Sequence, residues 1–517
     1  MAIESAYLLR YPLGAIVLAL ATLLMAVITH RLFLGPFSHI PGPRLAAVSS
    51  IWYAYHARNG TTAAIAKRLH RRYGPVVRVG PKEVWFNTKE AYDHIYSTGI
   101  RGYEKSDFYC RVYRTANAVR REQAVDKVMN DVIRKFDSID GAEIDLKEWM
   151  HIISVESLGA MVLSWSPGMI KAGTDRATSY QSYLGWRRKS VFGLFPLIVK
   201  LEVNYKWVGR LFGIVWGVTY QTPKGFKPFF PVCFSESRLY HASPSSTANE
   251  RNQEVARKVA RRIKNKSNPT SSQREDLLTD LINLHKDKPE FTESYLRKMA
   301  ITNFGAGHET LASTLIAIMA MLGTHPEAQA TATHEIRCQN AAKSRKPGSN
   351  ISYADALELV YTRAVIREAM RLYPVISMSL PRVVPLHGSG LQLSGLRIPP
   401  GATVGCNPVS LHRNEDICGP DPDKFDPRRW LAGSGTPDNI RALERYSLSW
   451  GGGSRTCPGR HVAEMIVLKC VVRLLDRFEV RAAVPPPEDQ GPTYFLAMLT
   501  GVRASFVPLE ECGMKQR

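Results

Sequence analysis

A glycine-rich stretch that ends in a cysteine constrains this chain more than any other feature. It occupies Trp450–Gly459 and reads WGGGSRTCPG, and a helical pattern follows over Arg460–Phe478. The glycines predict a bulged loop that lets a planar group approach the backbone closely, and Pro458 suits the first position of the helix. Cys457 is therefore expected at a helix N-terminus, where free amides and the helix dipole stabilise a thiolate. Arg455 adds positive charge beside it.

Two other interpretations of this stretch are less consistent with its residues. A glycine loop that binds phosphate would carry Gly-Lys followed by Ser or Thr, and that pattern is absent. A cysteine with a purely structural role needs neither three glycines nor an arginine just before it. The stretch therefore favours a thiolate that works against a planar ligand.

A long apolar segment over Tyr295–Leu322 has a polar centre. Its residues are apolar on nearly every face, which predicts a buried helix. The centre reads GAGHET over Gly305–Thr310, and a carboxylate beside a hydroxyl is costly in a core unless it is partnered. One interpretation is a kink with a local bond from the threonine to a carbonyl. The other is a widened turn that admits water, in which Glu309 and Thr310 pass protons.

A second predicted helix covers Ser352–Tyr373, capped by its first residue. Glu368 lies three residues after Val365 and four before Leu372, so it falls on the apolar stripe. Arg371 lies at contact spacing from it. A surface pair of this kind contributes little, but an inward-facing pair must hold further hydrogen bonds or it would destabilise the core. The placement favours a buried ion pair with further partners.

The N-terminus predicts a membrane anchor. Leu13–Thr29 has no charge, and its 17 residues are at the lower limit for crossing about 30 Å of hydrocarbon. A cleaved signal peptide is the competing interpretation, but the cleavage pattern is poor and basic residues follow the segment. We therefore expect an anchor over 1–30, transmembrane over about 11–29, a proline-rich hinge over 31–44 and a cytoplasmic body over 45–517.

Composition narrows the class of protein and its partners. Hydrophobic residues make up 44% and charged residues 22%, so wholesale disorder is excluded. The net charge of +22 suits an anionic membrane surface or an acidic protein, and without zinc-finger or RNA-binding signatures we expect no nucleic-acid partner. Eight scattered cysteines are too few for a disulfide scaffold, which favours a reduced, cytosol-facing body. The sequence predicts a mostly helical body with a small hairpin at Val76–Gly80 and Glu83–Phe86.

These segments together resemble the cytochrome P450 family. Trp450–Gly459 resembles the haem-ligand loop, Ala306–Thr310 is similar to the oxygen-activating central helix, and the Glu-x-x-Arg pair matches a further family motif. Phe425–Trp430 resembles the segment whose last arginine locks that pair. The resemblance covers nearly the whole chain and implies a mainly α fold with small β-sheets behind one transmembrane helix. Leu380–Asn414 looks like fungal secondary-metabolism members of the pisatin-demethylase and benzoate-hydroxylase type.

The resemblance also implies how haem b would be held. Cys457 would be the proximal thiolate ligand of the iron, which favours cleavage of the O–O bond. Arg455 and Arg382 would pair with the haem propionates. Three glycines would shape the loop against the haem: Gly451, Gly453 and Gly459.

Two further roles follow from the same resemblance. Thr310 and Glu309 would deliver protons through water during dioxygen activation. Glu368, Arg371 and Arg429 would hold the fold behind the haem, which is a structural role.

The implied function is a monooxygenase that hydroxylates, epoxidises or oxidatively couples a lipophilic small molecule in fungal secondary metabolism. Electrons would come from NADPH through an acidic NADPH-cytochrome P450 reductase that docks on the basic proximal face. The catalytic domain would be cytosolic, on a single-pass anchor in the endoplasmic reticulum membrane. Residues 180–232 would include part of the substrate channel and the membrane-facing surface, with an ordinary core as the alternative. The substrate is not identified by these patterns.

Three departures from the family pattern stand out. Trp450 replaces a commoner Phe, and Arg428 stands where Glu is usual. The region around 108–145 looks shortened, because relatives carry a helix there whose Arg reaches the propionates, and Arg120 and Arg121 are a poor substitute. The competing hypothesis is therefore a non-catalytic or haem-poor remnant. An isomerase or peroxide-using enzyme is disfavoured, because the acid and alcohol of the central helix would then be needless.

Overall fold

A computed structural model provides the structure of this chain. It describes residues 2–96, 119–219, 254–264, 276–288, 290–346, 348–433, 437–486 and 490–509. The expected shortening after Tyr109 falls partly on residues 97–118, which lie outside the described residues. Arg121, at the next described segment, binds Asp280 instead of facing a propionate site.

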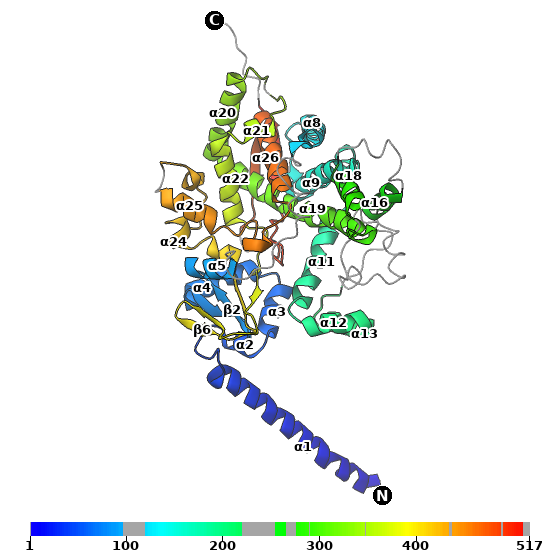
Figure 1. Ribbon diagram of the computed structural model, residues 1–517, viewed down its shortest axis with the longest axis vertical. Helices are drawn as coiled ribbons and strands as arrows, with labels where there is room; N and C mark the ends of the chain where they lie inside the picture. The colour runs from blue at the N-terminus through cyan, green and yellow to red at the C-terminus, as the bar shows by residue number, and fades with distance from the viewer. Residues whose placement is uncertain are drawn as a thin grey trace.

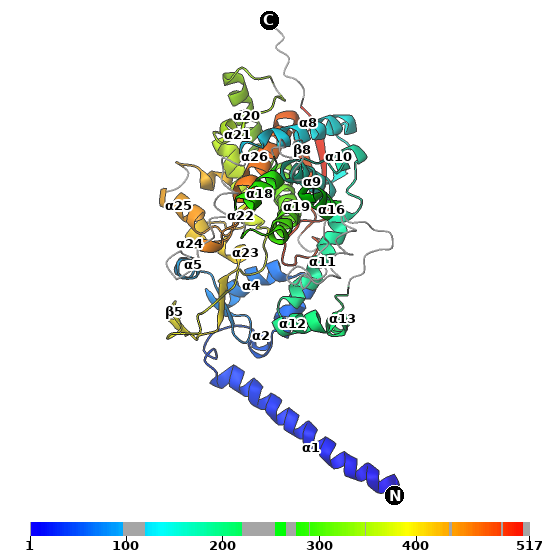
Figure 2. The ribbon, with the colours of Figure 1, turned by 45° about the vertical axis from the view of Figure 1, so that its right-hand side comes forward.

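Helices make up most of the body, and one long helix projects from it (Figure 1, Figure 2). The described residues form three small sheets with strand orders β1-β2-β7-β4, β3-β9-β8 and β5-β6. The first sheet lies at the end of the body from which α1 projects, and the long helices lie beyond it (Figure 1). The predicted mainly α fold with small sheets is therefore confirmed.

The N-terminal helix α1 (Ala2–Thr29) continues into a π-helical turn, His30–Leu34. Gly14–Leu34 is long and apolar enough to span a membrane, with a mean hydropathy of 2.1, and none of it is buried in the body. The same test selects α19 (Glu293–Thr324), which is mostly buried and serves as a core helix. The apolar helix thus extends five residues past its predicted end.

The predicted hinge is bound to the body by one buried side chain. Arg78 donates hydrogen bonds to five backbone carbonyls of the hinge, the helix after it and the first hairpin: Arg31, Phe37, Ala47, Gly80 and Pro81. Its own amide donates to the carbonyl of Pro41. Because a buried guanidinium is stable only when its donors are satisfied, these bonds fix where the chain enters the body.

The predicted hairpin is confirmed. Strands β1 (Val76–Arg78) and β2 (Glu83–Phe86) pair antiparallel, with Val76 opposite Phe86. Strand β2 pairs parallel to β7, which pairs antiparallel to β4. The bounds of the other strands are β3 (Ile144–Asp145), β4 (Arg382–Val383), β5 (Leu391–Leu393), β6 (Leu396–Ile398), β7 (Thr403–Cys406), β8 (Phe478–Ala483) and β9 (Arg503–Pro508).

Among the helices of the N-terminal half, α4 and α5 pack on the first sheet, while α8 and α9 join the helical core. They are α2 (Arg44–Val48), α3 (Ile51–Arg58), α4 (Thr62–Tyr73), α5 (Lys89–Tyr96), α8 (Glu122–Ile139), α9 (Leu146–Leu163), α10 (Met169–Ala172), α11 (Thr178–Phe192), α12 (Pro196–Asn204) and α13 (Lys206–Val215). Helix α12 has no buried residue, and large apolar side chains of α13 are exposed, among them Trp207 and Val215. An ordinary core is therefore the wrong interpretation of these two helices.

The remaining helices form the core and its surroundings. They are α16 (Glu254–Lys264), α18 (Leu277–Asp287), α19, α20 (Pro326–Ala342), α21 (Tyr353–Ala356), α22 (Val360–Leu372), α23 (Pro408–Leu411), α24 (Glu415–Cys418), α25 (Pro437–Arg445) and α26 (Arg460–Arg477), with 3-10 turns at Pro427–Trp430 and Gly453–Arg455. Helix α19 packs against α9, α16, α22 and α26. It is thus the central element of the fold, as its apolar pattern predicts.

The predicted helix over Ser352–Tyr373 is two helices. Ser352 does cap the first, α21, by accepting from the amide of Asp355. The second, α22, begins only at Val360, because the carboxylate of Glu335 on α20 accepts the free amides of Tyr361 and Thr362. A long-range cap, which spacing does not reveal, starts the helix that carries Glu368.

Candidate functional site

The cysteine loop is pressed against the end of α5. A Cβ at Gly453 would lie 2.1 Å from the carbonyl oxygen of Tyr96, and its φ of +60° also favours glycine. The amide of Cys457 donates to the carbonyl of Trp450 at 2.7 Å, which closes the loop. The side chain of Cys457 is exposed, three residues before the first residue of α26. Pro458 lies in the turn before that helix and not at its first position, which corrects the sequence prediction.

Tyr96 brings a second predicted residue to the same place. The guanidinium of Arg382 lies 5.1 Å from the centroid of the Tyr96 ring. The hydroxyl of Tyr96 donates to the carbonyl of Leu380 at 2.7 Å and accepts from the amide of Cys406 at 2.8 Å. Tyr96 therefore joins the strand that carries Arg382 to the glycine loop, and nothing in its local sequence indicates this.

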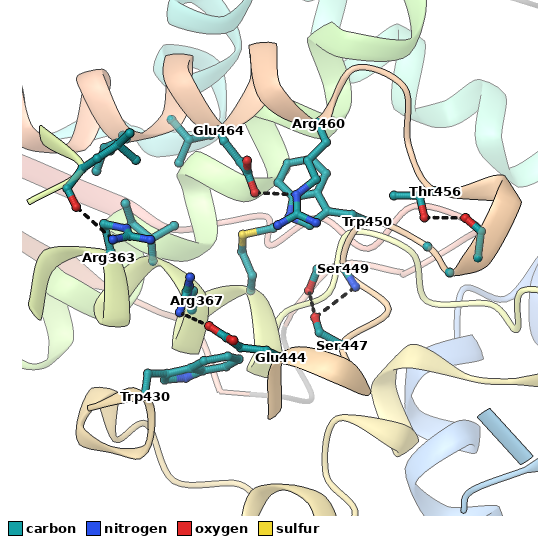
Figure 3. Close-up of a pocket in the computed structure, with 18 of the residues that line it drawn as sticks. Arg363, Arg367, Trp430, Glu444, Ser447, Ser449, Trp450, Thr456, Arg460 and Glu464 are labelled. Carbon is teal, nitrogen blue, oxygen red and sulfur yellow. Dashed lines mark hydrogen bonds and ion pairs between the residues drawn. The ribbon is translucent and has the colours of Figure 1, made fainter. Parts of the chain in front are cut away.

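A cavity of about 590 Å³ lies between the loop, α22 and α26 (Figure 3). Three arginines line it, Arg363, Arg367 and Arg460. Arg367 is paired with Glu444 at 2.8 Å and Arg460 with Glu464 at 2.8 Å. The cavity thus carries one more cation than anion among these side chains, beside the backbone of the glycine loop.

The middle of α19 has an open stripe although the helix is central. Thr302 and Ala306 are exposed and Thr310 is half-buried, at a spacing of four residues, while Leu311–Leu322 is buried throughout. This face of α19 is therefore not covered by other described residues, unlike the C-terminal part of the helix. The helix stays α-helical through this turn, so the widened turn is not observed. The Thr310 hydroxyl donates to the carbonyl of Ala306 at 2.8 Å, which is the local bond of the competing interpretation.

Glu309 is buried beside the open stripe, 4% exposed. The indole N–H of Trp186, on α11, donates to its Oε2 at 2.6 Å. Its Oε1 has no hydrogen-bond partner among the described residues. Because Trp186 lies 123 positions earlier in the chain, sequence patterns could not indicate this contact.

These residues fit a haem-thiolate group. An exposed thiol follows a loop that packs at Gly453 directly against the backbone of Tyr96, so the thiol is carried by a loop of fixed position. The uncovered stripe on α19 offers small or polar side chains, Thr302, Ala306 and Thr310. Arg455 is exposed, and Arg382 is half-buried beside Tyr96, so both cations are available to carboxylates. A sulfur ligand with two cations is the donor set that an iron porphyrin with two propionates requires.

The predicted ion pair is bidentate and buried. Arg371 donates from Nε to Oε2 and from Nη2 to Oε1 of Glu368, both at 2.8 Å. Nε of Arg429 lies 3.5 Å from Oε1, and its other nitrogens donate to backbone carbonyls at 2.9 and 2.8 Å. The indole N–H of Trp430 and the backbone amide of Asp426 also donate hydrogen bonds to the carboxylate of Glu368. The structure therefore brings the three predicted residues together and adds Trp430, which sequence reasoning missed.

The same network reaches the cysteine loop through His412. Arg371 donates to the carbonyl of His412 at 2.9 Å. Nε2 of His412 accepts from the amide of Leu448 at 2.8 Å, two residues before Trp450. Complete burial lowers the pKa of His412 to about 3, so the ring is neutral and its Nε2 can accept. The position of the loop is thereby tied to α22.

Comparisons with known proteins agree with this geometry. The sequence model of the family described as Cytochrome P450 matches residues 54–502. The chain is 48% identical to Cytochrome P450 monooxygenase sdnT of Sordaria araneosa, over 95% of each chain. It is 26% identical to Cytochrome P450 monooxygenase cicH of Emericella nidulans, over 87% of this chain and 90% of that one. It is also 26% identical to a pisatin demethylase of Fusarium vanettenii, over 87% and 84%.

Proposed function

Because the chain belongs to the cytochrome P450 family, we propose that it is a haem-thiolate monooxygenase that hydroxylates, epoxidises or oxidatively couples a lipophilic small molecule. Its fungal relatives are named as cytochrome P450 monooxygenases, at 48% identity in one case. The observation that carries the proposal is the exposed thiol of Cys457 on a loop that Tyr96 and the hydrogen bond from Cys457 to Trp450 hold in place. We place the reaction in fungal secondary-metabolite biosynthesis.

The haem would be held by the cysteine loop and two arginines. Cys457 would bind the iron as a thiolate, with Arg455 and Arg382 on the propionates. Haem b, when bound, supplies the activation of dioxygen, and a thiolate ligand favours O–O cleavage. The glycines Gly451, Gly453 and Gly459 let the flat ligand approach the loop.

Proton delivery falls to the open stripe of α19. Oγ1 of Thr310 donates to the carbonyl of Ala306, so its lone pairs can accept a hydrogen bond from water, and the hydroxyl would turn away from that carbonyl when it passes a proton on. Oε1 of Glu309 has no partner among the described residues and can hold the next proton. Positioned groups of this kind contribute about 10²–10⁴-fold to catalysis.

The network behind the haem has a structural role. Glu368, Arg371 and Arg429 are buried or nearly so. They connect α22 to His412 and to residues 418–430, and His412 in turn holds Leu448, just before the cysteine loop.

Electrons would come from NADPH through a cytochrome P450 reductase. The net charge of +22 and the arginines around the cavity beside the loop suit an acidic partner. The apolar helix over Gly14–Leu34 would anchor the protein in the endoplasmic reticulum membrane, with the catalytic domain on the cytosolic side.

The test is a carbon-monoxide difference spectrum of the reduced protein, co-expressed with a fungal reductase. We expect a band at the thiolate position in the natural protein and in Cys338→Ala, which removes an exposed thiol on α20. We expect Cys457→Ala to lose the band and all product. If the natural protein has no haem band, or an imidazole-type band, the remnant hypothesis is correct and the proposal is wrong.

A second pair of variants separates proton delivery from haem binding. Thr310→Ala is expected to keep the band and to lower the product formed per NADPH by about 10²-fold, the lower end for a positioned acid. Thr310→Ser keeps the hydroxyl and should remain close to the natural protein. Unchanged coupling in Thr310→Ala would refute the role of this hydroxyl.

A further inference from the structure

The Glu309 carboxylate is held by a neighbouring helix through a single donor. The indole N–H of Trp186 donates to Oε2 at 2.6 Å, while Oε1 has no partner among the described residues. A hydrogen bond to a carboxylate is stronger than one between neutral groups. One oxygen is therefore fixed by α11, and the other is buried without a hydrogen-bond partner among the described residues.

The Trp186 ring is itself held in place. It stacks on Phe495, with ring centroids 5.3 Å apart and planes at 23°. Nζ of Lys189, one turn further along α11, lies 4.0 Å from the ring centroid. An aromatic ring with a stacked neighbour and a cation over it has little rotational freedom. Its N–H can therefore set the direction of the carboxylate.

A second chain of buried side chains connects the same two helices. Nδ1 of His151 on α9 lies 3.1 Å from Oδ2 of Asp175, and its Nε2 lies 3.3 Å from Nδ1 of His308 on α19. Asp175 also accepts the amide of Ser179 at 2.9 Å, in the first turn of α11. The side chains of Asp175 and both histidines are almost completely buried. His308 and Glu309 are adjacent, so α11 is tied to α19 on two faces of one turn.

Close packing of α9 on α19 makes this chain possible. A Cβ at Gly307 would lie 2.9 Å from Cδ1 of Leu158, so a larger residue would force the Leu158 side chain on α9 to shift. Burial lowers the pKa of His308 well below its ordinary value, with the charges of His151 and Lys189 adding to the effect. The hydrogen bond from His151 helps to lower the pKa of Asp175 to about 2, against its burial. Asp175 and His308, at the two ends of this chain, thus each keep one charge state near neutral pH.

Lysines on both neighbouring helices act on this turn. Burial lowers the pKa of Lys147 on α9, and the charges of Asp145, Asp175 and Glu309 oppose that shift. The charge of Lys189 on α11 adds to the effect of burial in lowering the pKa of His308.

We propose that Trp186 is a positioning residue for the reaction. Its N–H fixes Oε2 of Glu309, so that Oε1 is the oxygen that carries the proton. The Asp175–His151–His308 chain keeps α11 and α19 in the relative position that this contact needs. The proposal rests on the proposed function, since it assigns the partner of the acid that would deliver protons. It makes α11, which contributes no ligand to the haem, part of the proton-delivery machinery.

The contact itself is tested without catalysis. Ultraviolet resonance Raman spectra of the holoenzyme report the hydrogen bonding of indole N–H groups. We expect the difference between the natural protein and Trp186→Phe to contain a strongly bonded indole band. Glu309→Gln should shift that band toward weaker bonding, because a neutral amide oxygen replaces a carboxylate. An unchanged band in Glu309→Gln means that the contact does not exist and overturns the proposal.

The catalytic consequence is tested on the same variants. Trp186→Phe keeps an aromatic ring against Phe495 and removes the N–H, so product per NADPH should fall about tenfold, the scale of one hydrogen bond to a charged group. The carbon-monoxide band and the substrate KM should stay unchanged. The matched control, Trp207→Phe, alters an exposed tryptophan on α13 and should have no effect.

Asp175→Asn provides a second variant, which weakens the link to His151 and leaves the indole in place. We expect a smaller loss of coupling and a broader indole band. If Trp186→Phe retains full coupling while Thr310→Ala loses it, the positioning role is wrong and the proposed function stands. If the natural protein has no thiolate band, the proposed function itself fails, and the Raman experiment still decides the contact.

Discussion

Glu368 and Glu309 are both buried carboxylates on core helices, yet their surroundings are opposite. Glu368 on α22 is completely buried and accepts hydrogen bonds from the Arg371 guanidinium, the Trp430 indole and the amide of Asp426. Glu309 on α19 is 4% exposed and receives one indole N–H. Burial is therefore nearly the same, while the number of donors differs.

We propose that the difference separates an acid with a structural role from an acid that carries protons. A buried carboxylate with every lone pair satisfied is held in one protonation state, and removing one partner leaves an uncompensated charge. A buried carboxylate with one free oxygen can exchange a proton at that oxygen. The two sites thus predict opposite responses: changes at Glu368 should affect stability, and changes at Glu309 should affect turnover.

The largest effect is expected for Glu368→Ala. It leaves the guanidinium of Arg371 buried without its carboxylate, which typically costs about 3–5 kcal/mol. We expect a loss of this size in the free energy of unfolding measured with urea, or no folded protein. The control is Glu444→Ala, whose exposed pair with Arg367 should contribute less than about 1 kcal/mol. Equal losses in the two variants would contradict the comparison.

Acid should weaken the same network through His412. Burial lowers the pKa of His412 from 6.5 to about 3, so the unfolded chain binds a proton below pH 6.5 that the folded state does not bind. The contribution of neutral His412 to the free energy of unfolding is fully present above pH 6.5. It is lost as the pH falls toward 3, by about 1.4 kcal/mol per pH unit. The measurement is the free energy of unfolding at pH 7, 6 and 5. His412→Gln should show a slope shallower by this amount, and identical slopes would exclude the assignment.

A smaller effect is expected for Arg429→Lys. The guanidinium of Arg429 lies 3.5 Å from the Glu368 carboxylate and donates to the carbonyls of Cys418 and Asp421. A lysine cannot make these three contacts at once. We expect a loss of about 1–2 kcal/mol, the scale of one or two charged hydrogen bonds. Arg428→Lys, at an exposed neighbour, should change stability by less than about 0.5 kcal/mol. If both variants behaved alike, Arg429 would not belong to the network.

The sequence predicts contacts within one element better than contacts between elements. The spacing of Glu368 and Arg371 places them on one face of a helix, and the structure confirms the pair. Apolar periodicity and the placement of glycines predict the hairpin, α19 and α26 in the same way. By contrast, Glu335 caps α22 from another helix, and Trp186 reaches Glu309 across 123 positions. Helical periodicity shows which face is buried, but it does not show which side chain of a distant element meets that face.

The smallest change in stability, and the sharpest test of the comparison, is expected for Glu309→Gln. The amide keeps an oxygen that can accept from Trp186, and it removes a buried charge that has one direct donor. We therefore expect the free energy of unfolding to change by no more than about 1 kcal/mol in either direction. Product per NADPH should nevertheless fall by about 10²-fold, because an amide cannot carry the proton. Both quantities are measured on one preparation whose carbon-monoxide band is intact. A destabilisation as large as that of Glu368→Ala would show that Glu309 holds the fold, and the distinction between the two acids would be lost.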